Sequence, residues 1–165
     1  MKVTARSERS STLVLGVGNI LYRDEGVGVA AATELARRDL PGVEVLDGGT
    51  LGLSLLGEVE GRERLLLLDA VVGIGEPPGS VIVLDSEAIH SELRMCLSAH
   101  HLGVPEVLAT ASLVGRAPER VAAIAMVPSC MELGLGLSTV AEAALGAMVQ
   151  QAVHVLEDWG VLAHA

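Results

Sequence analysis

Carboxylates stand near the ends of three predicted strands, and they are the side chains best placed to do chemistry. Glu25 lies in the turn after the first apolar run, Asp47 closes the second, and Asp69 follows four consecutive leucines. Because the carboxyl ends of parallel strands meet at one edge of a sheet, we expect the three side chains to converge. Asp69 is the most informative, since a carboxylate at the mouth of a buried strand is costly unless it is paired, hydrogen-bonded or bound to a metal.

Both aspartates also have a simpler structural interpretation. Asp69 would then cap the amides of the loop that follows its strand. Asp47 opens an Asp-Gly-Gly sequence, in which an aspartate side chain commonly accepts hydrogen bonds from backbone N–H groups of the same turn. Either role would use the carboxylate without any catalysis.

A histidine could complete a metal site with these carboxylates. His100 and His101 lie in Ser-Ala-His-His-Leu-Gly, next to an apolar segment and before a predicted helix. One imidazole and two carboxylates suit a divalent transition metal and leave positions open for water or substrate. The spacing alone is a weak signal, because the ligands are dispersed and no His-Glu-x-x-His motif occurs. The other histidines are expected at the surface: His90, His154 and His164.

Other catalytic and binding motifs are incomplete. The Gly16-x-Gly18 turn lacks the third glycine of a dinucleotide-binding fingerprint, and neither a phosphate-binding loop nor a Gly-x-Ser-x-Gly elbow occurs. Cys130 could act as a nucleophile with a histidine, although a single buried thiol is more often a packing residue. A nucleotide- or phosphate-binding module built on the glycine turn stays open as an alternative, but its acidic cleft argues against it.

Alternating strands and helices position these residues. Strands are predicted at 13–17, 43–46, 65–68, 80–84 and 121–127, and helices at 25–38, 51–58, 105–113 and 138–159. At the start of the last helix, Ser138, Thr139 and Glu142 resemble a capping box. Residues 86–103 show no clear pattern. Strand–helix alternation with short connections predicts the α/β class, as a three-layer sandwich with a mostly parallel sheet.

Composition favours a single domain that does not bind nucleic acid. Half of the 165 residues are hydrophobic and 1% are aromatic, so the core must be built from aliphatic side chains. The formal net charge of −10 would repel a phosphate backbone. We expect residues 1–12 to form a flexible N-terminal tail and residues 13–165 to form the domain.

The sequence also predicts a cytoplasmic protein with no membrane association. Cys96 and Cys130 have neither a disulfide-framework nor a metal-type spacing, which suits a reducing compartment. Polar residues stand at Ser10-Ser11-Thr12, where a signal peptide would need an apolar run. No segment reaches the roughly 20 apolar residues of a membrane span.

Four ordered motifs resemble those of the hydrogenase maturation proteases, the endopeptidases that trim the C-terminus of the nickel–iron hydrogenase large subunit. The motifs are Gly18-Asn19-Ile20-Leu21 with Asp24-Glu25-Gly26-Val27-Gly28, Asp47-Gly48-Gly49-Thr50-Leu51-Gly52, Leu68-Asp69-Ala70 and Ser98-Ala99-His100-His101-Leu102-Gly103. They follow the family order at about the family intervals, and the similarity runs from Leu13 to Gly160.

The resemblance implies roles for particular residues. Glu25, Asp69 and His100 would be the metal ligands and the catalytic groups, with His101 a neighbour of the ligand. Asp47 and its glycines would shape the substrate cleft, and Asp47 is a further candidate catalytic residue. The resemblance also implies a twisted, largely parallel five-stranded sheet flanked by helices, and a monomer. Ala99 replaces a proline that is common before this histidine in the family.

The implied activity is that of an aspartic-type or metal-dependent endopeptidase that removes the C-terminal extension of the nickel-loaded hydrogenase large-subunit precursor. The precursor would supply the nickel, which would act as the recognition element, and another divalent metal could bind in vitro. Since no serine or cysteine nucleophile is evident, attack by water with help from a carboxylate is the economical mechanism. A non-catalytic chaperone that binds nickel or the hydrogenase stays open as an alternative.

Overall fold

The protein folds around a five-stranded sheet with the strand order β2-β1-β3-β5-β4. The computed structural model describes residues 9–85 and 103–164. The strands are β1 (Thr12–Val17), β2 (Val43–Gly49), β3 (Arg64–Ala70), β4 (Val81–Leu84) and β5 (Arg120–Met126). Neighbouring strands are parallel except β4, which runs antiparallel to β5 at one edge. The prediction of a mostly parallel five-stranded α/β fold is confirmed.

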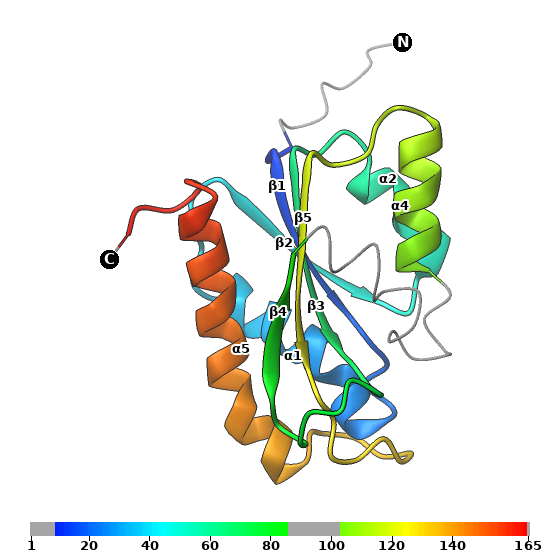
Figure 1. Cartoon of the computed structure of the whole chain (residues 1–165), viewed down its shortest axis with the longest axis vertical. Helices are drawn as coiled ribbons and strands as arrows, with labels where there is room; N and C mark the ends of the chain where they lie inside the picture. The colour runs from blue at the N-terminus through cyan, green and yellow to red at the C-terminus, as the bar shows by residue number, and fades with distance from the viewer. Residues whose placement is uncertain (1–8, 86–102, 165) are drawn as a thin grey trace.

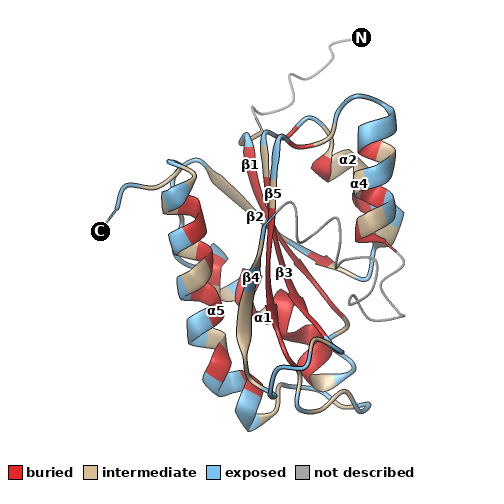
Figure 2. Ribbon diagram, in the orientation of Figure 1, coloured by how far each residue is buried: buried red, intermediate tan, exposed pale blue. Residues whose placement is uncertain are grey.

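Helices cover both faces of the sheet. They are α1 (Val27–Ala36), α2 (Leu56–Val59), α4 (Val104–Leu113) and α5 (Thr139–Asp158), with two short 3-10 turns, η1 (Arg23–Gly26) and η2 (Gly52–Leu55). Helices α1 and α5 share one face, whereas α2 and α4 lie on the other, which gives the three layers seen in Figure 1. Figure 2 shows that burial is concentrated in the central strands and on the inner sides of the helices.

The leucine run of β3 supplies both halves of the core. Leu66 and Leu68 pack with α1 and α5, whereas Leu65 and Leu67 pack in the cluster under α2 and α4. All four are buried, because a central parallel strand is covered on both sides. A continuous apolar run is therefore the pattern that this position requires.

Several predicted boundaries differ from the structure. The helix predicted from residue 25 begins at Val27, because the preceding residues form the separate turn η1. The helix predicted over 51–58 is divided into η2 and a single turn, α2. Strand β3 continues through Asp69, which pairs with Ala125 of β5, so this carboxylate lies within the ladder rather than just beyond it.

The start of α5 corrects the capping prediction. Ser138 is the N-cap, and its hydroxyl accepts a hydrogen bond from Ala141 N–H at 3.2 Å. A capping box places its acidic residue three positions after the N-cap, whereas Glu142 lies four positions after Ser138. The predicted N-terminal cap is therefore present, but the capping box is wrong.

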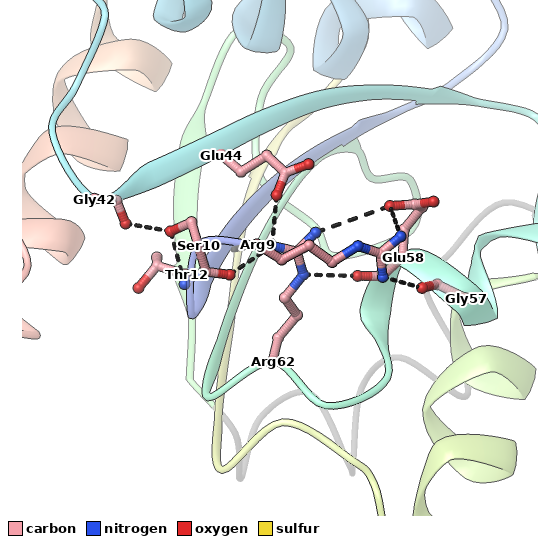
Figure 3. A network of polar contacts seen from close by, with 8 residues as sticks. All are labelled: Arg9, Ser10, Thr12, Gly42, Glu44, Gly57, Glu58 and Arg62. Carbon is pink, nitrogen blue, oxygen red and sulfur yellow. Dashed lines mark hydrogen bonds and ion pairs between the residues drawn. The ribbon is translucent and has the colours of Figure 1, made fainter. Parts of the chain in front are cut away.

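A buried arginine organises the edge of the sheet where the parallel strands begin (Figure 3). The Arg62 guanidinium donates to Glu44 at 2.6 Å and to the carbonyls of Ser10 and Glu58. Arg9 forms an ion pair with Glu58 at 2.9 Å. Arg9 and Ser10 therefore make defined contacts, although both belong to the predicted tail; residues 1–8 of that tail lie outside the described residues.

The first turn of α1 packs against the strands so closely that only glycine fits at position 28. A Cβ added to Gly28 would lie 2.1 Å from the Leu68 carbonyl oxygen and 2.4 Å from that of Val17. Both are backbone atoms of the sheet, which cannot move aside as a flexible side chain would. This contact brings α1 and the η1 turn before it to the carboxyl ends of β1 and β3.

Gly28→Ala is therefore expected to destabilise the protein strongly, by about 2–3 kcal/mol or more, because the added methyl group overpacks a rigid contact. Gly146→Ala is the matched control, since it also lies within a helix but no atom lies within 4 Å of its added Cβ. This control should raise the free energy of unfolding by about 0.5–1 kcal/mol through helix propensity. Chemical denaturation measures both effects, and equal stability of the two variants would contradict the close packing of α1.

Candidate active site

Glu25 and Asp69 come together at the carboxyl edge of the sheet. Asp69 is the penultimate residue of β3, and the alternation of side chains places it on the same face as Leu65 and Leu67. Glu25 belongs to η1, which contacts β3. Both carboxylates are almost fully buried, with 3% of Asp69 and 4% of Glu25 exposed. The predicted convergence of these two residues is seen in the structure.

This arrangement changes the protonation of Asp69. Burial raises the pKa of the Asp69 carboxyl to about 8, the hydrogen bond from Ala70 N–H lowers it, and the negative charge of Glu25 raises it further. Without a cation, Asp69 therefore holds a proton at neutral pH. A divalent cation placed between the two carboxylates would displace that proton and remove the repulsion between them.

The Asp69 carboxyl group is hydrogen-bonded to the backbone of its own strand. Its Oδ1 accepts a hydrogen bond of 2.7 Å from the backbone N–H of Ala70. Asp69 thus bonds a backbone amide, as the structural interpretation expected, but that amide belongs to the last residue of β3 and not to the loop after it. The bond to Oδ1 fixes the orientation of the carboxyl group.

Asp24, the neighbour of Glu25, holds this part of the site in place. It is fully buried, and its carboxylate accepts hydrogen bonds from the N–H groups of Ser129 (2.9 Å), Cys130 (3.0 Å) and Ser138 (2.7 Å) and from the Ser138 hydroxyl (2.8 Å). Its own N–H donates to the Cys130 carbonyl at 3.1 Å. One side chain thereby joins η1, the loop after β5 and the first turn of α5.

The same hydrogen bonds keep Asp24 ionised. Burial alone would raise the pKa of Asp24, but the bonds from Ser138, Cys130 and Ser129 outweigh it and hold the pKa below its usual value of 3.8. The two adjacent acids therefore differ in role: Asp24 is a structural anion saturated by donors, whereas Glu25 faces Asp69. Sequence reasoning noticed the acidic pair but missed the structural role of Asp24, whose partners lie more than 100 residues away.

Asp47 stabilises its own turn, which is the structural role that the Asp-Gly-Gly sequence allows. It is exposed, and its Oδ1 accepts a hydrogen bond of 2.9 Å from Gly49 N–H within the turn. In the sheet register Asp47 aligns with Gly16, and Gly16 aligns with Leu68, so Asp47 is two strands away from β3 and on the face opposite to Asp69. The structure therefore does not bring Asp47 together with Glu25 and Asp69, and a catalytic role for it stays a prediction.

His100 and His101 lie outside the described residues, as do His90 and Cys96. The described chain resumes at Gly103, where an added Cβ would lie 2.6 Å from the Cα of Gly52. Gly52 closes the Asp47 motif, so the end of the histidine motif packs at the carboxyl edge of the sheet. Across residues 9–85 and 103–164 no group of three potential metal ligands is present, so the structure brings together two of the three predicted ligands, Glu25 and Asp69.

Comparisons with known proteins identify the family of this chain. The sequence model of the hydrogenase maturation protease family matches residues 29–155. The hydrogenase 2 maturation protease of Escherichia coli is 37% identical over 151 residues, which cover 90% of this chain and 92% of the relative. The hydrogenase expression/formation protein HupD of Rhizobium leguminosarum is 39% identical, over 90% of this chain and 75% of the relative.

Solved structures give the same result. The hydrogenase maturating endopeptidase HybD from E. coli superposes with a TM-score of 0.83 at 33% identity, covering 90% of this chain and 93% of that one. The NiFe hydrogenase maturation protease HybD from Thermococcus kodakarensis gives 0.75 at 30% identity, covering 87% and 97%. These sequence and structure matches define an endopeptidase of hydrogenase maturation. This chain belongs to the hydrogenase maturation protease family.

A helix that crosses a membrane must be both long and apolar. In the part of the chain that the structure describes, none of the helices combines the length and the hydrophobicity that crossing a membrane requires.

Asp24→Asn is expected to lower the free energy of unfolding at pH 7 by about 2–4 kcal/mol, because the amide turns a donor toward backbone N–H groups that need an acceptor. The pKa of Asp24 is lowered in the folded state, so its stabilisation is present above about pH 4 and is lost as the pH falls further. The difference in free energy of unfolding between wild type and the Asp24→Asn variant should accordingly become smaller toward pH 2–3.

Denaturation at pH 7 and at low pH tests this expectation. Asp47→Asn is the matched control, since asparagine keeps the acceptor for Gly49 N–H and should leave stability nearly unchanged. An Asp24→Asn protein as stable as wild type at pH 7 would show that Asp24 does not hold the site together.

Proposed function

We propose that this protein is the endopeptidase that removes the C-terminal extension of a nickel–iron hydrogenase large-subunit precursor once that precursor carries nickel. Membership of the hydrogenase maturation protease family supports the class of substrate. The observation that carries the proposal is the buried pair Glu25 and Asp69 at the carboxyl edge of the sheet. Such a pair is unfavourable without a cation and is satisfied by one.

In this proposal nickel belongs to the substrate. Glu25 and Asp69 would bind the precursor's nickel from the protease side, and His100 would complete the set with an imidazole. Two carboxylates and one imidazole suit a borderline divalent ion and leave positions for ligands from the precursor. A precursor without nickel would leave Asp69 protonated and the site without a cation to bind, so recognition and metal loading would be linked.

Cleavage itself would use water. Binding of the metal releases the proton from Asp69, which leaves two carboxylates next to the scissile segment. A carboxylate oxygen at hydrogen-bond distance from a water can accept its proton as the water attacks the carbonyl carbon. Among the described residues the one cysteine, Cys130, has its backbone N–H and carbonyl bonded to Asp24, so its place in the structure is that of a partner of Asp24.

The test uses a matched large-subunit precursor, prepared with and without nickel, and measures the mass of its C-terminus after incubation. Wild-type protein should shorten only the nickel-loaded form. Glu25→Gln, Asp69→Asn and His100→Ala should each reduce the rate at least about 100-fold, because each removes a ligand of the metal. Glu142→Gln, the same change at an exposed position of α5, should process the precursor like wild type.

Three results would count against the proposal. Equal cleavage of both precursor forms would contradict recognition through nickel. Full activity of the Glu25 and Asp69 variants would contradict their assignment as ligands. Tight binding of the loaded precursor without any shortening would favour the chaperone alternative. Thermal denaturation of each variant separates loss of activity from loss of fold.

A further inference from the structure

Exposed apolar side chains gather next to the carboxylate pair. We use the term apolar ridge for five residues that are between 42% and 75% exposed: Ile20, Leu21, Tyr22, Leu133 and Leu135. Three come from the turn before η1, and two from the loop between β5 and α5. Singly exposed apolar residues are ordinary, but a contiguous group of them marks an interaction surface.

Hydrogen bonds join the two segments of the ridge to each other. Gly134, between the two leucines, donates its N–H to the Leu21 carbonyl at 2.8 Å and accepts from Arg23 N–H at 3.1 Å. Tyr22 and Gly134 form a parallel β-bridge. Below them, Asp24 bonds to Ser129, Cys130 and Ser138. The ridge is therefore a preorganised surface, for which binding costs little conformational entropy.

The ridge is continuous with the candidate active site. Glu25 N–H donates to the Tyr22 carbonyl at 3.1 Å, so the carboxylate pair and the ridge are parts of one short turn. Glu25 and Asp69 are only 3–4% exposed, so a metal held in another protein reaches them only if that protein lies close against the rim of the site. The ridge adjoins the site through the turn that Glu25 and Tyr22 share, so a partner seated on this side of the rim touches the ridge.

The charge beside the ridge indicates what the partner presents there. Arg23 lines a groove of about 370 Å³ that runs from Ile20 along α1 to Leu145 of α5. Within the described residues, the Arg23 guanidinium makes no ion pair or hydrogen bond, whereas Arg37 in the same groove pairs with Glu34 at 2.7 Å. In a chain with a net charge of −10, this groove has a local excess of positive charge. An acidic side chain is its natural complement.

We propose that the apolar ridge and Arg23 form the docking surface for the hydrogenase large-subunit precursor, which would present aliphatic side chains and an acidic residue beside its cleavage segment. This inference rests on the proposed function, because it takes the precursor as the occupant. It adds that affinity comes mainly from the ridge, whereas the metal acts in selection and cleavage.

The test replaces both exposed leucines, as Leu133→Asn with Leu135→Asn, and measures kcat and KM on the nickel-loaded precursor. Both side chains are 75% exposed, so the fold should be unaffected. We expect KM to rise about 10- to 100-fold with kcat nearly unchanged, because the ridge binds ground state and transition state equally. Arg23→Gln should raise KM several-fold and weaken its dependence on salt.

The matched control is Leu113→Asn with Val114→Asn. These residues are 87% and 55% exposed at the end of α4, near the opposite edge of the sheet, and their replacement should leave KM unchanged. An unchanged KM in the ridge variant, while wild type cleaves the precursor, would overturn the docking surface and leave the proposed function standing. Failure of wild-type protein to bind or cleave any loaded precursor would overturn both.

Sedimentation of the same proteins tests another occupant. Wild-type protein that dimerises, with a ridge variant that is monomeric and a control variant that still dimerises, would make the ridge a contact between two copies of this chain. That result would overturn the proposal. A wild-type monomer together with the raised KM of the ridge variant supports it.

Discussion

The carboxyl edge of this protein depends on one buried carboxylate, that of Asp24. It accepts four hydrogen bonds from the loop after β5 and from the start of α5, which lie more than 100 residues further along the chain. The Ser138 hydroxyl that donates to it also caps α5. The turn that carries Glu25 is therefore fixed on both sides, by α1 packed at Gly28 and by this network.

The fixed turn holds Glu25 beside Asp69, and burying two acids next to each other lowers the stability of the folded protein. Glu25 and Asp69 are buried next to each other, and both burial and the charge of Glu25 raise the pKa of Asp69 to about 8. The metal-free protein accordingly loses stability as the pH rises from about 4 toward 8, where the unfolded chain is ionised but folded Asp69 still holds its proton. Functional sites commonly keep such unfavourable groups, and a stable scaffold offsets their cost.

Much of the scaffold could be predicted because short stretches of sequence determine it. The Leu65–Leu68 run requires a strand buried on both faces, and the glycines around residues 16–28 mark the close approach of helix and strands. The convergence of Glu25 and Asp69 followed from the topology of parallel strands. The resemblance of four motifs to the hydrogenase maturation proteases led to the correct family.

What the sequence could not supply are contacts between distant segments. Nothing near Asp24 indicates that its partners are Ser129, Cys130 and Ser138, and nothing near Arg62 indicates Glu44 or the carbonyl of Ser10. The capping box was predicted wrongly because Ser138 and Thr139 are both suited to an N-cap position. The N-cap is Ser138, whose hydroxyl also donates to Asp24, a contact that the local sequence does not reveal. Asp47 could not be assigned either, since its turn chemistry and a role in a cleft use the same residue types.

The central claim is that Asp69, buried beside Glu25, holds a proton in the metal-free protein and loses it when a divalent metal binds. Carbon-13 NMR of the aspartate carboxyl groups, assigned for Asp69 with an Asp69→Asn sample, measures this directly as a pH titration with and without Ni²⁺. We expect a titration midpoint of about 8 for Asp69 in the metal-free protein and a clear downward shift when Ni²⁺ is added. A midpoint near the ordinary value of 3.8 that Ni²⁺ does not change would contradict this claim.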